Sequence, residues 1–145
     1  MAATAEELKG VPLFSGLSHR QLRRLGRDFK ERSFRPGVEI VRQGHMSGVD
    51  FFVIVDGKVA VTVDGKEVVR LGPGDHFGEL ALISEGERTA TVTAVTRLRC
   101  LVIAFWDFRR FAKENPDVSW ALLQYLAGLL TGERDRRSRA AALQV

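Results

Sequence analysis

The first thirty residues carry apolar positions at helical spacing. Leu22, Leu25 and Phe29 recur at intervals of three and four residues, with basic residues between them. This period predicts a short amphipathic helix with one buried face. Ser18 stands three residues before Gln21, which is the spacing of a capping box at a helix start. We therefore expect an N-terminal helical segment over residues 1–29.

From Phe29 onward the hydrophobic pattern changes to the short runs typical of β-strands. These runs are separated by turn-forming residues at Pro36–Gly37, Gln43–Gly44, Asp56–Gly57, Asp64–Gly65 and Gly72–Gly74. An Asp-Gly pair between alternating apolar runs favours a hairpin, because a type I′ turn needs positive φ at both central positions. Asp56–Gly57 and Asp64–Gly65 therefore predict hairpins in antiparallel β structure.

Two further strand-like runs, 89–96 and 99–105, bring the expected total to about eight strands, which favours a closed jelly roll or small barrel. The helical period then returns, and Asn115–Pro116 places a capping side chain and a proline at a helix start. We expect a single domain over residues 1–145 that is mostly β with flanking helices. It comprises a double-stranded β-helix (jelly roll) of antiparallel strands over 30–105 and two C-terminal helices over 106–137.

The last predicted helix is more apolar than one buried stripe requires. Leu122, Leu126 and Leu129 share one face, whereas Trp120, Leu123 and Leu130 extend the apolar surface well beyond it. A second copy of this helix or a ligand would cover the excess. A helix wedged between the sheet and its neighbours within one subunit is the alternative interpretation.

Composition supports a small folded domain without disulfides. The chain has 145 residues, of which 45% are hydrophobic and 28% charged, close to the globular average. Cys100 is the only cysteine and lies in an apolar run, so we expect a buried, inert thiol. Neither a signal peptide nor an apolar stretch long enough to span a membrane is present, which predicts a cytoplasmic protein without a membrane partner.

The net charge of +4 is unevenly distributed along the chain. Residues 19–35 hold seven Lys or Arg against two Asp or Glu, and the last thirteen residues hold four arginines against two acids. The middle of the chain is mildly acidic. The basic helix around Arg20–Arg27 is a candidate surface for nucleic acid or an acidic partner, and a solvated helix face is the alternative.

One segment, residues 72–92, combines glycines, carboxylates and an arginine in a pattern that suits a nucleotide. Backbone N–H groups after a tight bend or at a helix start form an anion cradle, and Arg88 supplies a charged fork that matches phosphate. Glu79 would repel a phosphate, so we expect it to accept hydrogen bonds from sugar hydroxyls or to orient Arg88. An Arg88–Glu79 ion pair that closes a loop without a ligand is the alternative.

The runs Phe77–Leu82 and Arg88–Val92 resemble the phosphate-binding cassette of cyclic-nucleotide-binding domains, a family that includes catabolite activator protein, protein kinase regulatory subunits and cyclic-nucleotide-gated channels. The resemblance extends over nearly the whole chain. Further matching segments follow in the family's order at 11–17, 34–37, 41–44, 52–59 and 72–75.

The resemblance implies a cassette over residues 77–92 with defined roles. Glu79 would bind the ribose 2′-hydroxyl and Arg88 the exocyclic phosphate oxygens, while Gly78 leaves room for the ribose. Backbone groups of the cassette would complete the cradle, and three apolar residues of the roll would wall the base. These further positions are Leu80, Ala81, Thr89 and Ala90 in the cassette, and Val61, Val69 and Leu71 in the roll.

The ligand that this resemblance implies is cAMP, on the breadth of the family, and Thr89 permits cGMP. Glu87 occupies the place where many members carry proline, which lowers affinity unless its carboxylate turns to solvent. Signalling would follow from rearrangement of the cassette and the C-terminal helix. Leu123, Leu126 and Leu130 are the candidate lid residues, and Arg134 would reach the base if the helix continues past Gly132.

Catalytic and DNA-binding functions find less support. Only three histidines occur, at positions 19, 45 and 76, and no nucleophile or Walker motif is present, so we expect no enzyme, no metal and no cofactor. A helix-turn-helix domain needs roughly fifty residues, whereas fifteen follow Leu130. The expected partners are a cyclic nucleotide, a second copy through the C-terminal helix and an unidentified effector protein. A member that has lost nucleotide binding and uses its basic termini to contact protein or DNA is the alternative function.

Overall fold

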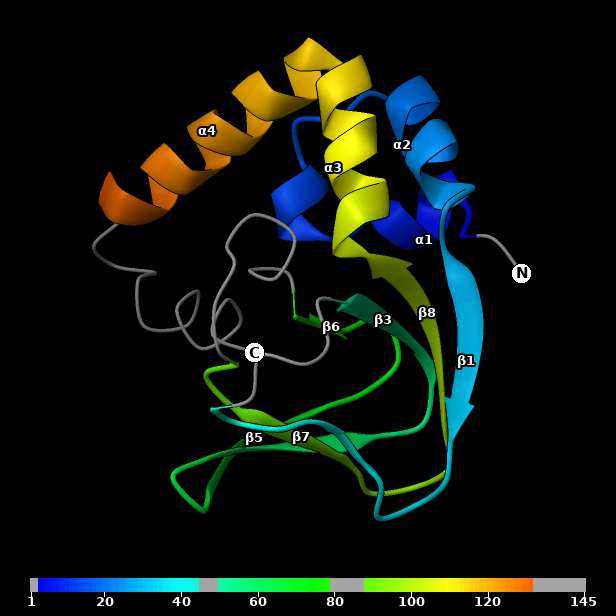
Figure 1. Ribbon diagram of the computed structural model, residues 1–145, viewed down its shortest axis with the longest axis vertical. Helices are drawn as coiled ribbons and strands as arrows, with labels where there is room; N and C mark the ends of the chain where they lie inside the picture. Colours follow the sequence, from blue (N-terminus) through cyan, green and yellow to red (C-terminus); the bar gives the residue numbers. More distant parts are fainter. Residues whose placement is uncertain (1–2, 45–49, 79–87, 132–145) are drawn as a thin grey trace.

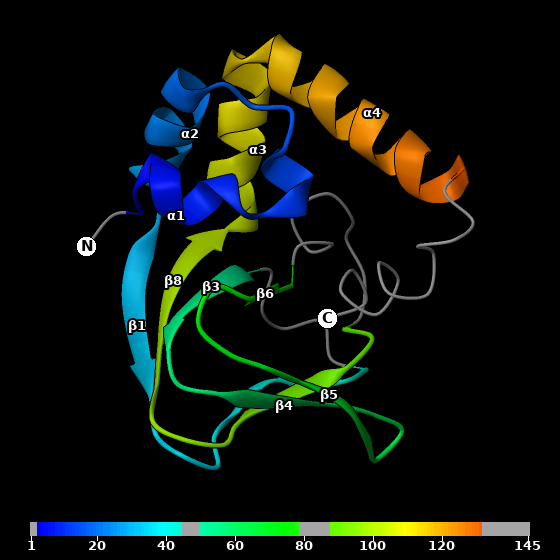
Figure 2. The same ribbon diagram turned by 180° about the vertical axis from the view of Figure 1, so that it is seen from behind.

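The computed structural model describes residues 3–44, 50–78 and 88–131, and it places the helices together at one end of a β-roll (Figure 1). The helical elements are α1 (Ala5–Lys9), the 3₁₀ turn η1 (Pro12–Phe14), α2 (His19–Gly26), α3 (Phe105–Glu114) and α4 (Pro116–Thr131). Viewed from behind, α1, α2 and α3 cover the end of the roll, and α4 projects from them (Figure 2). Helices before and after the strands therefore meet in space.

The described residues form eight strands in two four-stranded antiparallel sheets. One sheet has the order β1-β8-β3-β6, and the other has the order β2-β7-β4-β5. Their bounds are β1 (Lys30–Phe34), β2 (Glu39–Val41), β3 (Asp50–Asp56), β4 (Val59–Val63), β5 (Lys66–Leu71), β6 (His76–Phe77), β7 (Thr91–Ala94) and β8 (Leu98–Ala104). This arrangement confirms the predicted antiparallel jelly roll with flanking helices.

Only one of the two predicted hairpins forms. Asp64 and Gly65 both have positive φ, 52° and 81°, and they join β4 to its antiparallel neighbour β5. The prediction for Asp56–Gly57 is wrong, because β3 and β4 lie in different sheets. Gly57 has φ +97°, and a Cβ there would clash with the Arg97 carbonyl oxygen. The close approach bends the chain from one sheet to the other.

Strand β3 separates two hydrophobic cores. Phe51 and Val53 pack with the helices, whereas Phe52 and Ile54 face the interior between the two sheets. Because the strand is covered on both faces, its apolar run is continuous rather than alternating. Burial of each such side chain contributes about 1.5–3 kcal/mol. The same strand thus fastens the helices to the roll.

The ends of the helices differ in part from expectation. The Ser18 backbone N–H donates to Gln21 Oε1 at 2.8 Å, and the Gln21 N–H donates to Ser18 Oγ at 3.2 Å, which confirms the predicted capping box. The sequence predicts that the Asn115 side chain caps the start of α4, but the structure pairs this side chain with α3. Its Nδ2 donates to the Phe111 carbonyl oxygen at 2.9 Å, so this side chain closes α3.

Helix α4 exposes much of its apolar surface. Leu122 is buried, but Trp120, Leu123 and Leu130 are 64%, 59% and 75% exposed, and the Leu129 side chain lies outside the described residues. The interpretation of α4 as a helix wedged on all sides within one subunit is therefore wrong. In the described ranges, no helix combines the length and apolar character needed to cross a bilayer.

Candidate functional site

Arg88 is a buried cation at the entrance to β7. It is 7% exposed and is the only charged or polar residue among those described that is buried to this extent. Its Nη2 donates to the Asp50 backbone carbonyl at 2.8 Å. Its Nε has no hydrogen-bond partner in the described part of the chain. The guanidinium thus holds donor capacity away from water, where an unused donor is costly.

Gly78 determines where the Arg88 side chain lies. Its φ is +84°, and a Cβ at this position would lie 2.8 Å from Arg88 Nη1 and 2.7 Å from the Asp50 carbonyl oxygen. A side chain here would therefore displace the guanidinium as well as strain the backbone. The structure brings Gly78 and Arg88, two residues of the predicted cassette, together and gives a steric reason for the glycine that differs from the predicted room for a ribose.

Asp50, the first residue of β3, is the member of this cluster that the sequence did not reveal. Its carboxylate Oδ2 lies 3.6 Å from Arg32 Nη1, while its carbonyl receives the Arg88 hydrogen bond. Burial raises the pKa of Asp50, and Arg32 and Arg88 act in the opposite direction. Because the contact uses a backbone carbonyl from a residue 38 positions away, no side-chain motif signals it.

The electrostatic environment of Arg88 favours an anion. Burial lowers the pKa of Arg88, and Asp50 acts in the opposite direction. Arginine remains protonated near neutral pH even so, because its ordinary pKa exceeds 12. Among the described residues, this buried positive charge has one carbonyl and one partly neutralised carboxylate beside it, and a bound anion would compensate it further.

His76 lies on β6, next to this cluster in sequence. Its ring is 5.8 Å from the ring of Phe51, and burial lowers its pKa while Asp75 opposes the shift. Across the described ranges, no group of three His, Cys, Asp or Glu side chains is arranged to hold a metal ion. Cys100 faces the core between the sheets, where burial raises its pKa to about 12. The thiol is therefore unreactive at neutral pH.

The remaining predicted site residues occupy three environments. Val61 and Ala90 are buried between the sheets, and Val69 and Leu71 of β5 are half-buried against the same core. Val69 pairs directly with Val61 across the β4–β5 ladder. Thr89 is exposed. Glu79, Leu80, Ala81 and Glu87 lie outside the described residues, as does Arg134.

The lid candidates lie on α4, which packs against α3 and the η1 turn. Leu126 is half-buried, whereas Leu123 and Leu130 are exposed. In this conformation, neither exposed leucine is covered by another described element. Their predicted role as a lid therefore requires a movement of α4.

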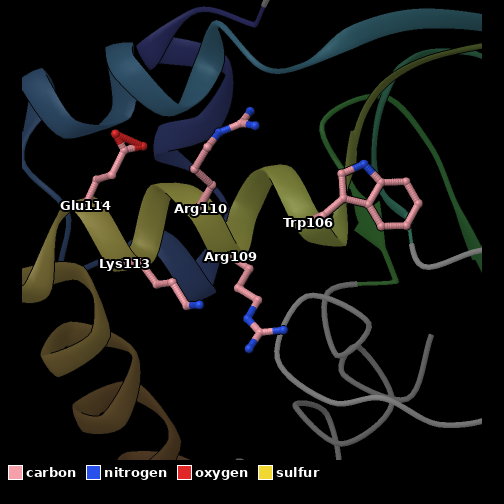
Figure 3. Close-up of a pocket in the computed structure, with 5 residues that line it drawn as sticks. All are labelled: Trp106, Arg109, Arg110, Lys113 and Glu114. Carbon is pink, nitrogen blue, oxygen red and sulfur yellow. The ribbon is translucent and has the colours of Figure 1, made fainter.

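A hollow of about 540 Å³ lies on the outer surface of α3 (Figure 3). It is lined by Trp106, Arg109, Arg110, Lys113 and Glu114. Trp106 is 63% exposed, and Arg110 is already held by Asp107 at 2.8 Å. This hollow is open and lacks a buried charge, so the Arg88 cluster is the stronger candidate for a built anion site.

Comparison with known proteins identifies the class to which this fold and site belong. Residues 31–115 match the family model described as "Cyclic nucleotide-binding domain". The chain therefore belongs to the cyclic nucleotide-binding domain family, which confirms the resemblance seen in the sequence. In this family the domain is regulatory rather than catalytic.

Individual relatives come from different kinds of protein. The chain is 42% identical over 112 residues to the cAMP-dependent protein kinase regulatory subunit of Schizosaccharomyces pombe, covering 77% of this chain and 27% of that protein. It is 32% identical over 143 residues to the cyclic AMP receptor protein of Thermus thermophilus, covering 95% of this chain and 62% of that protein. The chain is thus shorter than both relatives.

A solved structure of similar extent is also close in fold. The N-terminal domain of a transcriptional regulator from Streptomyces coelicolor superimposes with a TM-score of 0.77 at 30% identity. The match covers 89% of this chain and 95% of that domain. The arrangement of helices and strands described above is therefore that of a regulatory domain found in longer proteins.

Proposed function

We propose that this chain is a cyclic-nucleotide sensor and that the cyclic phosphate binds at Arg88. The observation that carries the proposal is a guanidinium that is buried, positioned by Gly78 and only partly satisfied by the Asp50 carbonyl. Relatives named for cAMP support cAMP as the ligand. Thr89 lies next to Arg88 and is exposed, so its hydroxyl permits cGMP as well.

The unsatisfied Nε donor of Arg88 has an energetic cost. A buried charge that lacks partners destabilises a fold by several kcal/mol, whereas a charge-assisted hydrogen bond to phosphate is roughly twice as strong as a neutral one. A cyclic phosphate would accept from the Arg88 fork without requiring another protein acceptor. The site thus stores unfavourable free energy that an anionic ligand relieves.

The other predicted site residues bind the remaining parts of the nucleotide around Arg88. Glu79 accepts from the ribose 2′-hydroxyl, and backbone groups at Leu80, Ala81, Thr89 and Ala90 complete the cradle. Val61, Val69 and Leu71 form an apolar wall for the base, consistent with their position on neighbouring strands of one sheet. Glu87 lowers affinity if its carboxylate faces the phosphate.

The proposed output is a shift in the population of helix positions. Capture of the phosphate moves the cassette, and Leu123, Leu126 and Leu130 then repack over the base. The exposed residues Trp120, Leu123 and Leu130 follow each other at intervals of three and seven along α4. This stripe suits a second copy of the same helix, so we also propose a homodimer through α4.

Calorimetry with cAMP, cGMP and 5′-AMP tests the proposed ligand class. We expect saturable 1:1 binding of cAMP and weaker or comparable binding of cGMP. Binding of 5′-AMP should be much weaker, because its phosphate carries an additional negative charge and does not form the cyclic phosphodiester ring. Absence of heat and of a thermal shift with both cyclic nucleotides would contradict a nucleotide-binding role. It would favour the alternative, a protein-interaction module, for which the basic helix α2 is the relevant observation.

A further inference from the structure

Helix α2 and its C-cap carry four exposed arginines, of which Arg20, Arg23 and Arg24 lie in the helix and Arg27 is the C-cap residue. Arg20, Arg23, Arg24 and Arg27 are all exposed, and within the described ranges none of them forms an ion pair or a side-chain hydrogen bond. The helix packs on the core through Leu22, Leu25 and Gly26 instead. No acidic residue lies within the helix itself. The positive charge is therefore available on the outer face.

The spacing of these arginines is unfavourable for the helix. Arg20 and Arg24, and likewise Arg23 and Arg27, are four residues apart and so lie side by side on the helix surface. Like charges at this spacing destabilise a helix by a few tenths of a kcal/mol per pair. Arg20 also stands in the first turn, where the helix dipole disfavours a cation. Arg23, Arg24 and Arg27 stand in the last turn and at the C-cap, where the dipole favours a cation, so the local conflict consists of the like-charge spacing and of Arg20.

Acidic residues near α2 are already engaged elsewhere. Asp28 lies 4.0 Å from Arg110, whose guanidinium extends from α3 toward α2 (Figure 3). Glu31 lies 3.9 Å from Arg99. Glu7 accepts from the Thr4 backbone N–H at 2.9 Å, as part of a capping box. These three carboxylates therefore do not pair with the α2 arginines, and Glu6, which lines a hollow together with Arg23 and Arg27, is the nearby acid that remains.

A hollow of about 330 Å³ runs beside this charged face. It is lined by residues of the N-terminal segment and by one row of α2, namely Ala3, Thr4, Ala5, Glu6, His19, Arg23 and Arg27. Two arginines one helical turn apart therefore border a depression, and Glu6 limits it on the α1 side. The feature offers both shape and charge to a partner.

We propose that α2 docks an acidic segment of a partner protein, with carboxylates one helical turn apart facing the two rows of arginines. Arg–carboxylate pairs are often bidentate, and arginine is enriched at protein interfaces. The limited size of the surface favours a peptide over nucleic acid. The eight residues of α2 span about 12 Å. The phosphate charge of a nucleic-acid duplex would extend beyond this length, toward the carboxylates of Glu6 and Glu7, which would repel it. None of the residues that line this surface belongs to the cluster around Arg88.

Fluorescence anisotropy with a defined probe tests the proposal. The probe is a labelled 16-residue helical peptide with glutamate at every fourth position, and a labelled 16-base-pair duplex of mixed sequence is measured in parallel. The whole chain and its Arg20→Gln, Arg23→Gln, Arg24→Gln and Arg27→Gln variants are titrated at low and physiological salt. Arg97→Gln removes an equally exposed arginine from a strand connection outside α2 and serves as the matched control.

We expect the peptide to bind and to dissociate as salt rises. Each α2 substitution should weaken binding about two- to fivefold, because exposed Arg–carboxylate pairs contribute about 0.4–1 kcal/mol. Arg97→Gln should leave binding unchanged. Peptide affinity that is insensitive to the α2 substitutions, or duplex binding that is tighter than peptide binding and lost in the same variants, would overturn the proposal.

Thermal unfolding supplies an independent readout. Removing an unfavourable first-turn cation in Arg20→Gln should raise Tm by about 1–3 °C while weakening the peptide complex. A lower Tm for Arg20→Gln together with unchanged peptide binding would assign the arginines to the fold. The same variant must bind cAMP as the parent chain does, since α2 is separate from Arg88.

Discussion

At the scale of single residues, Arg88 is the buried cation that we propose binds the ligand. Its Nη2 is satisfied by the Asp50 carbonyl, while its Nε has no partner among the described residues. Full compensation within the protein would leave no reason to bind an anion. Removal of all compensation would destabilise the fold. The partial satisfaction seen here is what a reversible phosphate site requires.

Gly78→Ala tests the placement of Arg88 without removing its charge. The new methyl group would lie 2.8 Å from Arg88 Nη1, so we expect the guanidinium to shift and cAMP affinity to fall at least about tenfold. Gly74→Ala is the matched control. Gly74 also has a left-handed φ, +89°, but a Cβ there meets nothing within 4 Å.

The positive φ should cost both variants about 1–2 kcal/mol of stability, and Gly78→Ala should lose more because its Cβ also meets the Asp50 carbonyl oxygen. Isothermal titration with cAMP and urea denaturation of the two variants separate the effects. Equal cAMP affinities for Gly78→Ala and Gly74→Ala would show that the space around Arg88 does not determine binding.

The buried side chain of His76 should lower the free energy of unfolding in mild acid. Burial lowers its pKa below the ordinary value of 6.5, so the unfolded chain binds a proton more readily than the folded chain. The contribution of neutral His76 to the free energy of unfolding is therefore lost as pH falls below about 6.5. Asp75 reduces the effect. Asp50, whose pKa is raised by burial, acts in the opposite sense, because the folded chain binds its proton more readily than the unfolded chain.

Urea midpoints measured between about pH 7 and pH 5 check this expectation. The parent chain should lose stability toward pH 5, and His76→Gln should flatten the dependence. His19→Gln, at an exposed position, should keep the parental slope. A His76→Gln variant with the full parental slope would assign the pH dependence to another group.

The sequence predicted some site residues better than others. Arg88, Gly78 and Ala90 could be placed because their residue types and order match a family motif. Asp50 could not be predicted, because it contributes a backbone carbonyl from a distant strand. The steric role of Gly78 toward Arg88 was also missed, since it depends on the path of a side chain ten residues further along.

At the scale of elements, local patterns identified strands and helices but not all of their partners. The Asp64–Gly65 turn has the φ values of a type I′ hairpin, as predicted. The Asp56–Gly57 turn carries a similar sequence signal, yet it joins two different sheets. The difference arises from the approach of Gly57 to the Arg97 carbonyl, a contact between residues forty positions apart. A local turn signal cannot specify such a contact.

Helix α4 provides a prediction about assembly. If its exposed stripe pairs with a second copy, Trp120→Ser combined with Leu123→Ser should weaken dimerisation at least about tenfold, because both side chains lose apolar burial at the interface. Sedimentation velocity over a range of concentrations measures the change. Trp106→Ser, at 63% exposure on α3, removes a similarly exposed tryptophan and should leave the dimer intact. A parent chain that stays monomeric with and without cAMP would reject the dimer.

At the scale of the whole molecule, the basic excess and the proposed nucleotide site lie in different parts of the chain. The basic excess lies on α2 and near the C-terminus in sequence, whereas Arg88 belongs to a mildly acidic middle region. The overall charge therefore says little about the nucleotide and more about macromolecular partners. The order of helix, strands and helices, and the antiparallel roll, could be predicted because hydrophobic periodicity changes twice along the chain. The double burial of β3 could not, since it depends on which elements cover each face.

The most direct test of the central claim is the cAMP affinity of Arg88→Ala, measured by calorimetry beside Arg97→Ala. Loss of a desolvated charge-assisted contact should cost about 2–5 kcal/mol, which corresponds to a decrease in affinity of about 30-fold to several thousandfold. Arg97→Ala should bind as the parent chain does. Unchanged cAMP affinity in a folded Arg88→Ala variant would contradict the assignment of the phosphate site.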